Sequence, residues 1–158
     1  MLNAAKALAH IDRLLRLTAV ACMLLIGSVA FGQGVELVGL DGENLSELEL
    51  QQGSVVVIVW TTWNRSNRPV FDRINEIVEQ WGDRARVIAV NLQEEWGTVE
   101  DSINNQTLLA PVYLDPDGAF CKKYAATRLP NLIVFRNGVL AFSGALPDDP
   151  NRLLREIL

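Results

Sequence analysis

Two asparagines, Asn64 and Asn67, lie three positions apart in the polar stretch WNRSNRP, which follows a run of valines. A carboxamide accepts and donates hydrogen bonds, and asparagine is favoured at helix N-termini and in turns. Because it neither ionises here nor forms a disulfide, this pair offers hydrogen bonding rather than electron transfer. The simplest interpretation is a capping role in a turn between a strand and a helix.

Other reactive side chains are scarce. The chain has one histidine, His10, and two cysteines, Cys22 and Cys121. Beyond residue 32 there is no histidine and a single thiol, too few for a Ser-His-Asp site, a Cys-His site, a usual zinc site or an internal disulfide. We therefore expect no metal and no cofactor, although carboxylate chemistry stays open.

Cys121 has two interpretations. A lone cysteine is most often a small buried apolar residue. Alternatively, Lys122 and Lys123 would favour the thiolate of an exposed Cys121, which would then be a reactive thiol that couples to another protein or to a small thiol. Exposure of the sulfur distinguishes the two interpretations.

The N-terminus has the layout of a secretory signal peptide. Basic residues within 1–16 precede fifteen uncharged residues, 17–31, and small residues follow. This layout predicts cleavage after Gly32 and export to the periplasm or another extracytoplasmic space. The alternatives are an uncleaved anchor, for which the apolar run falls short of the roughly 20 residues of a spanning helix, and a lipoprotein cysteine at Cys22. We expect one domain over residues 35–158.

The charge of the exported part excludes one class of partner. Without residues 1–32 the chain keeps 11 basic and 18 acidic side chains, a net charge of −7. An acidic domain offers no extended cationic surface, so no nucleic-acid partner is expected. The acidic pairs Glu94-Glu95 and Asp148-Asp149 are expected in loops, as solvated surface.

Strand and helix patterns alternate along the chain. Apolar, β-branched runs predict strands at 55–62, 86–92, 110–115, 132–135 and 139–144. Apolar residues at helical spacing predict helices at 70–81, 98–109, roughly 118–125 and 150–158. The Asp-Gly pair within 35–50 and Arg-Asn-Gly at 136–138 predict hairpins. This order predicts an α/β fold, a central mixed sheet with helices on both faces.

Two helix starts can be predicted more closely. The helix over 70–81 is expected to begin near Asn67, because proline is tolerated in a first turn and this start puts Pro69 there. The helix over 98–109 is expected to start at Thr98, with acidic residues in its first turn.

The order of elements and their residues together resemble the thioredoxin fold, and more narrowly the exported TlpA-type relatives of thiol-disulfide oxidoreductases. The family's redox segment is a buried strand, Trp, two residues, Trp, and Cys-x-x-Cys opening a helix. Here the strand is followed by WTTWNRSN, residues 60–67. The family's cis-proline strand and hairpin are similar to LPNLIVF, residues 129–135, followed by RNG. An extra helix and strand within 93–117 suit the TlpA type, and the resemblance covers residues 35–158.

The resemblance also exposes a departure, because both redox positions of the family hold asparagine here. Dithiol–disulfide exchange needs a thiolate nucleophile and a second thiol to resolve the mixed disulfide. Asn64 and Asn67 supply neither. The buried acid of thioredoxin, six residues before the first cysteine, is Ile58 here. The resemblance therefore implies a redox-inactive relative.

The resemblance implies a binding groove as well, since the family's cis-proline loop contacts substrates and can pair with an extended peptide through its backbone. Trp60 is expected in the core, and Trp63 either packs on the surface or contacts a partner. The implied groove residues are Trp63, Asn64, Arg65, Ser66, Asn67, Leu129 and Pro130.

We accordingly expect an exported, redox-inactive module that binds a protein or an extended peptide client, or acts as a scaffold, in the cell envelope. Membrane contact is expected only through an uncleaved N-terminal segment. One alternative is a single-thiol redox protein using Cys121. Another is a relative of thiol-disulfide oxidoreductases in name only.

Overall fold

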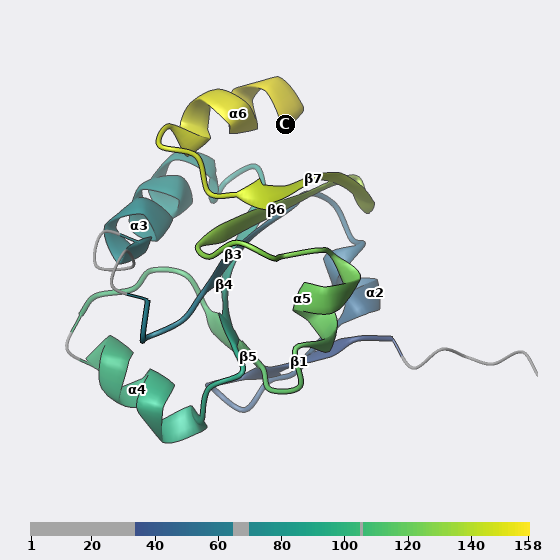
Figure 1. Ribbon diagram of the computed structural model, residues 1–158. Coiled ribbons are helices and arrows are strands. Elements are labelled where there is room, and N and C mark those ends of the chain that lie inside the picture. The colour runs from purple at the N-terminus through teal and green to yellow at the C-terminus, as the bar shows by residue number, and fades with distance from the viewer. Residues whose placement is uncertain (1–33, 65–69, 105) are drawn as a thin grey trace, which may run out of the picture. The chain divides into compact units, whose positions relative to one another are not determined.

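The computed structural model describes residues 34–64, 70–104 and 106–158. The predicted signal segment lies outside them, as do Arg65, Ser66, Asn67 and the predicted helix start around Pro69. In the described part, seven strands form one mixed sheet in the order β2-β1-β5-β4-β3-β6-β7 (Figure 1). The strands are β1 (Glu36–Gly39), β2 (Leu45–Ser46), β3 (Val55–Trp60), β4 (Arg86–Leu92), β5 (Val112–Asp115), β6 (Asn131–Arg136) and β7 (Val139–Ala145). The helices are α2 (Glu47–Leu50), α3 (Val70–Trp81), α4 (Trp96–Asn104), α5 (Ala119–Lys123) and α6 (Pro150–Ile157).

The centre of the sheet is β3, whose sequence VVVIVW is buried at every position. It pairs in parallel with β4 and antiparallel with β6. Strands covered on both faces read as continuous apolar runs, because neither set of alternating side chains meets water. The predicted buried strand is therefore confirmed, ending at Trp60 rather than Thr62.

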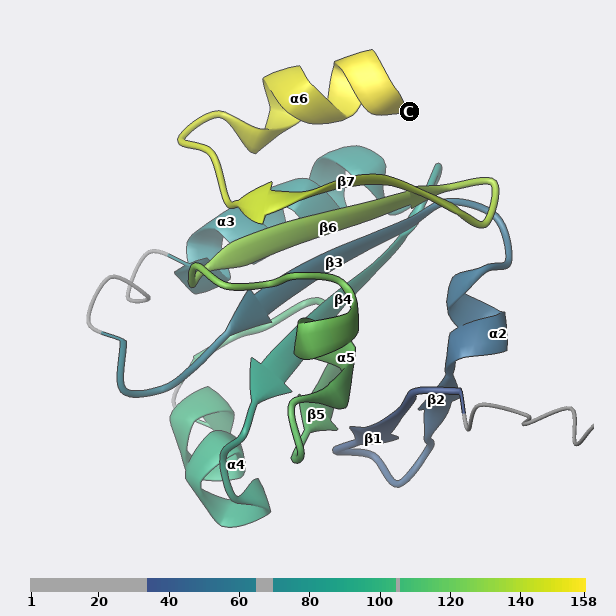
Figure 2. The ribbon, with the colours of Figure 1, turned by 45° about the vertical axis from the view of Figure 1, so that its right-hand side comes forward.

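Helices cover both faces of the sheet. The apolar cluster on one face takes in residues of α3, α4 and α6, among them Ile74, Val99 and Leu154. The cluster on the other face takes in Leu50 of α2 and Phe120 of α5. Figure 2 shows α3 behind β3 and β6, and α5 in front of the strands. The predicted mixed sheet with helices on both faces is confirmed.

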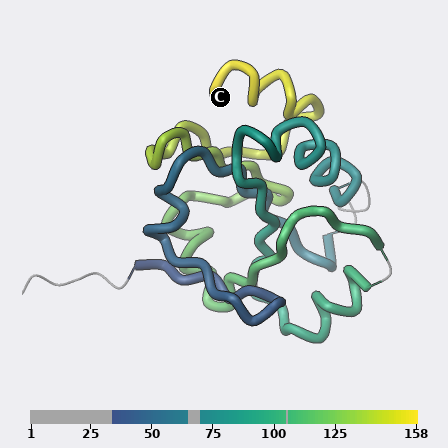
Figure 3. The backbone as a smooth tube through the Cα atoms, turned by 180° about the vertical axis from the view of Figure 1, so that it is seen from behind, coloured from purple at the N-terminus to yellow at the C-terminus, as the bar shows by residue number. Residues whose placement is uncertain are grey.

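The C-terminal helix is positioned by hydrogen bonds as well as by apolar packing. α6 lies beside α3 (Figure 3), and Trp81 Nε1 donates to Asn151 Oδ1 at 2.9 Å. Asp149, expected only as solvated surface, also caps α6, since its carboxylate accepts from Arg152 N at 3.0 Å. Pro150 opens the helix, as predicted.

The stretch 35–50 is only partly the predicted hairpin. β1 and β2 pair antiparallel, but β2 ends at Ser46 and a short helix, α2, follows. The carboxylate of Glu49 accepts from Ser46 N at 2.8 Å and from Ser46 Oγ at 2.7 Å. These bonds satisfy polar groups at the start of α2. The helix was not predicted, because its apolar and polar residues alternate as they do in a strand.

The prediction for α4 was wrong at both ends. The helix starts at Trp96, because Val99 N already donates to the carbonyl of Glu95, and its first turn contains no acidic residue. It ends at Asn104 instead of 109. Asn75 of α3 explains the early end, since its side chain donates to Thr107 O and accepts from Leu109 N, both at 2.8 Å, and holds this segment out of the helix.

Within the described residues, no helix combines the length and apolar character needed to cross a membrane.

Candidate functional site

The chain leaves β3 through two tryptophans with opposite environments. Trp60 is buried, and its ring meets that of Phe71 in α3 edge to face, with centroids 4.7 Å apart. Trp63 is 68% exposed. The core role expected for Trp60 is confirmed, and Trp63 presents a large apolar surface to solvent.

The segment after β3 is joined to the loop before β6. The Leu129–Pro130 peptide bond is cis, and β6 begins at the next residue, Asn131. Asn64 Nδ2 donates to the carbonyl oxygen of Leu129 at 3.0 Å, across 65 positions of sequence. The structure therefore brings together Asn64, Leu129 and Pro130, which the sequence placed in one groove, while Arg65, Ser66 and Asn67 lie outside the described residues.

The same segment is anchored by the carboxylate of Glu94, which was predicted to lie on the solvated surface. Glu94 follows β4 and is half-buried. It accepts from Thr62 N and from Asn91 Nδ2, both at 2.6 Å, and from Thr62 Oγ1. The expectation of a solvated acidic pair was therefore wrong for Glu94, although Glu95 is exposed. Hydrogen bonds from neutral donors to a carboxylate are stronger than neutral pairs, so Glu94 fixes the exit of the chain from β3.

Replacing Glu94 with alanine is expected to lower the free energy of unfolding by about 2 kcal/mol, because Thr62 and Asn91 lose a charged acceptor. Urea denaturation measures the loss, and faster amide exchange at Thr62 would locate it. The matched control is Glu95→Ala, an exposed neighbour expected to stay within about 0.5 kcal/mol of wild type. Equal stability of the two variants would contradict an anchoring role for Glu94.

The strand ends beneath this segment carry buried polar groups. Asn91 at the end of β4 lies opposite Trp60 in the parallel register, and Asn131 at the start of β6 lies opposite Val59. Both asparagines are buried. No described residue pairs with their Oδ1 atoms or with Trp60 Nε1. Since buried polar atoms are usually paired, three such atoms at neighbouring strand ends are an uncommon feature of this part of the sheet.

Cys121 lies on the other face of the sheet, in α5, and is 5% exposed. The carboxylate of Asp115 accepts from Phe120 N at 3.1 Å and from Cys121 N at 2.9 Å. Burial raises the pKa of the Cys121 thiol, and the hydrogen bond to Asp115 and its negative charge raise that pKa further. Cys121 is therefore not an exposed thiol with a low pKa. The structure supports the interpretation of Cys121 as a small buried apolar residue.

Native protein at neutral pH is expected to leave Cys121 unmodified by iodoacetamide, because a thiol that is buried and protonated is a poor nucleophile. Mass spectrometry of the peptide containing Cys121 measures the modified fraction. The same peptide should be fully modified once guanidinium unfolds the chain. Rapid modification of the native protein would contradict the buried thiol.

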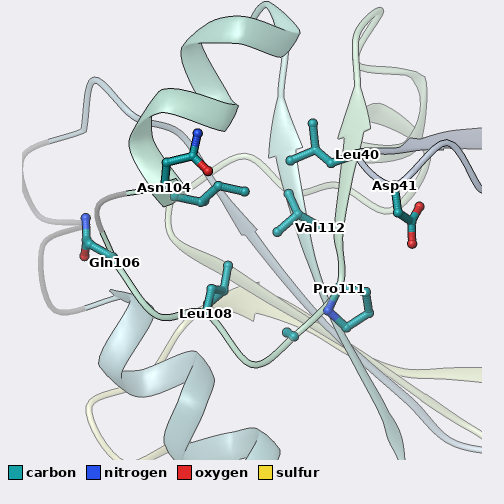
Figure 4. A pocket seen from close by; sticks show the side chains of 9 residues that line it. Leu40, Asp41, Asn104, Gln106, Leu108, Pro111 and Val112 are labelled. Carbon is teal, nitrogen blue, oxygen red and sulfur yellow. The ribbon is translucent and has the colours of Figure 1, made fainter.

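A shallow pocket of about 300 Å³ lies away from these residues, between α4 and the β1 and β5 edge (Figure 4). Its lining is mostly apolar, with Asp41, Asn104 and Gln106 as the polar members. Asp41 is already engaged, because its Oδ1 accepts from Glu43 N at 3.0 Å. None of the described groove residues lines this pocket. Across the described ranges, no cluster of three or more His, Cys, Asp or Glu side chains is arranged to hold a metal ion.

Solved structures share this architecture. The exposed lipoprotein thioredoxin Etrx1 of Streptococcus pneumoniae strain TIGR4 matches with a TM-score of 0.67 and 19% identity over 78% of this chain and 97% of its own. The fold is thioredoxin-like. A putative thiol:disulfide interchange protein DsbE from Chlorobium tepidum gives 0.68 and 23% over 78% and 90% of the two chains. A secreted Mycobacterium tuberculosis disulfide oxidoreductase homologous to E. coli DsbE gives 0.64 and 15% over 78% and 96%.

These neighbours confirm the thioredoxin-like fold predicted from the sequence. At such identities the likeness establishes the fold alone, because one fold carries many functions. Neither protein-family models nor curated protein sequences give a match.

Proposed function

We propose that residues 34–158 form a redox-inactive thioredoxin-like module that binds an extended segment of a client protein. The observation that carries this proposal is the hydrogen bond from Asn64 to the carbonyl of Leu129. A carboxamide stands where the resemblance places the first redox cysteine, and it faces the loop that holds the cis-proline. The scaffold of a thioredoxin-like site is thus retained around a residue that has no thiol chemistry.

The lack of dithiol chemistry follows from composition and burial. The module contains a single cysteine, Cys121, and thiol–disulfide exchange of the thioredoxin kind needs two thiols near each other. Cys121 is buried in α5, where its backbone N–H donates to the carboxylate of Asp115. In place of a reaction, the site offers hydrogen-bonding groups and an exposed ring.

Binding is supported by the surface beside Asn64. Trp63 is 68% exposed, and Leu129 and Pro130 are half-buried. Tryptophan is enriched among the residues that dominate interface energies, and exposed apolar patches on soluble domains mark contact sites. These three residues form a partly apolar surface, as expected for a surface that still contacts a partner. An extended client is favoured because the Leu129–Pro130 segment leads directly into β6, so its backbone can pair with an added strand.

Export is part of the proposal. The basic segment followed by fifteen uncharged residues supports a signal peptide or an anchor. Two of the solved neighbours are described as an exposed lipoprotein and as a secreted protein. The additional helix and strand between β4 and α5 support placement among TlpA-type relatives. We accordingly assign the module to the cell envelope, outside the cytoplasm.

An insulin-reduction assay tests the redox half of the proposal. Wild-type protein with a small dithiol as reductant should give no turnover above the uncatalysed rate, because it lacks a resolving thiol pair. The double variant Asn64→Cys with Asn67→Cys is the positive control, and it should gain measurable reductase activity. Turnover by the wild type would refute redox inactivity.

The binding half is tested with short, capped, cysteine-free peptides that carry no charged side chains. Wild-type protein should bind a subset of them, and Trp63→Ala should weaken binding by about tenfold or more, since anchor tryptophans contribute roughly 2 kcal/mol. Leu48→Ala is the matched control, because Leu48 is 73% exposed but belongs to α2. Absence of binding by the wild type, or equal losses in both variants, would sink the proposed groove.

A further inference from the structure

The loop that holds the cis-proline has a strand neighbour on one side. β6 pairs antiparallel with β7, and the pairing continues past the end of β6, where Leu146 N donates to Pro130 O at 2.9 Å. On its other side, β6 pairs antiparallel with β3 as far as Val59 opposite Asn131. The carbonyl of Pro130 is therefore paired on the β7 side.

On the β3 side the pairing stops at Asn131, two residues short of Leu129. Continuing the register would place Thr61 opposite Leu129, but β3 ends at Trp60. The chain then turns toward Glu94, which accepts from Thr62 N. Leu129 thus faces no strand of the described chain on this side, and the space beside it has the geometry of a sheet edge.

Asn64 fills this position with a side chain. Its Nδ2 donates to Leu129 O at 3.0 Å, as the backbone N–H of a paired strand would. A carboxamide N–H and a peptide N–H are donors of the same chemical kind. We infer that Asn64 is a built-in competitor that occupies the backbone acceptor of the groove, so that an extended peptide pairing with Leu129 displaces it. This inference rests on the proposed function, since it concerns the same groove.

The competition has a predictable size. A peptide N–H that bonds to Leu129 O replaces the hydrogen bond from Asn64. The binding free energy therefore lacks the net contribution that a new hydrogen bond to an unoccupied carbonyl would give. A carbonyl oxygen can accept two hydrogen bonds, which keeps the competition partial. Net hydrogen bonds contribute roughly 0.5–1.5 kcal/mol, so removal of the competitor should tighten peptide binding about 2- to 12-fold.

The test uses full-length protein and the same uncharged, cysteine-free peptides, with dissociation constants measured by calorimetry. Asn64→Ala removes the donor, and Asn64→Asp keeps the size of the side chain but cannot donate. Both variants should bind the best peptide about 2- to 12-fold more tightly than wild type. The matched control is Asn75→Ala, because Asn75 Nδ2 also donates to a distant backbone carbonyl, that of Thr107, and should leave affinity unchanged.

The possible results distinguish failure of the proposed competitor from failure of the proposed peptide groove. Tighter binding by both variants at Asn64, with Asn75→Ala unchanged, supports the competitor. Wild-type binding that is equal to or tighter than that of the Asn64 variants overturns the competitor and leaves the peptide groove standing. Failure of the wild type and of every variant to bind any peptide overturns the groove, and the competitor with it.

Discussion

Replacing Trp60 with alanine is expected to lower the free energy of unfolding by about 3–5 kcal/mol, the range found for truncating large buried aromatic side chains. Trp60 is 1% exposed and ends the central strand, where its ring packs edge to face on Phe71. Truncation would leave a cavity between β3 and α3, directly beneath the segment that carries Trp63 and Asn64. Equilibrium urea denaturation followed by circular dichroism measures the loss.

Trp60→Phe is the control that separates ring packing from the indole N–H. No described residue accepts a hydrogen bond from Trp60 Nε1, although that atom is buried. Phenylalanine keeps an aromatic ring against Phe71 and removes a donor without a partner, so it should cost about 1 kcal/mol. A loss as large as that of Trp60→Ala would show that the indole N–H, rather than the ring, is what stabilises this position.

The second large effect is expected at Glu47, the first residue of α2. Its carboxylate is largely buried and accepts from Lys123 Nζ at 2.7 Å, from Tyr124 OH at 2.6 Å and from Val35 N at 3.3 Å. These bonds tie α2 to α5 and to the chain before β1. Glu47→Ala leaves the buried Tyr124 hydroxyl without its acceptor and should cost about 3 kcal/mol at neutral pH.

The effect of Glu47 should depend on pH in a defined direction. Burial alone would raise the pKa of this carboxyl, but hydrogen bonds from Lys123, Tyr124 and Val35 and the charge of Lys123 together outweigh burial and lower it. Because the folded pKa lies below the unfolded value near 4.5, the stabilisation is complete above that value and is lost as pH falls through the folded pKa.

Glu47→Gln tests this linkage without changing the size of the side chain. The variant should be less stable than wild type by about 2 kcal/mol at pH 7, and the difference should shrink as the pH falls below 4.5 and the wild-type carboxyl is protonated. The comparison is urea denaturation across that pH range. Glu79→Gln, at an exposed position of α3, is the matched control for replacing a carboxylate with a carboxamide. A difference at Glu47 that stays constant with pH would contradict a stabilising charge.

The regular elements could be predicted from the sequence because their signals are local. The strand over 86–92 was predicted at its observed bounds, and the helix over 70–81 at its observed end, Trp81, since each has a long apolar pattern of one period. The predicted helix start near Asn67 lies outside the described residues. The helix α2 was missed because LSELEL alternates like a strand. Ser46 followed three positions later by Glu49 is a helix-start pattern that could have identified it.

The contacts of the candidate site could not be predicted in the same way. Glu94 reaches Thr62 across 32 positions and Asn64 reaches Leu129 across 65, so no local pattern relates either pair. Whether these residues meet depends on which strands pair in the sheet. The strand pairing was predicted only through the resemblance to a known fold. Two adjacent acids look alike in sequence, yet the turn after β4 buries part of Glu94 and leaves Glu95 exposed.

The order of strands also governs when the central strand is covered in a newly made chain. β3 is covered on one side by β4, but its other neighbour, β6, begins only at Asn131. Pairings between distant segments form slowly, because the entropy of loop closure is lost before the contact is gained. A nascent chain that has not yet released residues 131–136 therefore displays VVVIVW with an open edge, which is the type of segment that aggregates. Completion of the strands after Asn131 therefore covers this edge and lowers the tendency of a newly made chain to aggregate.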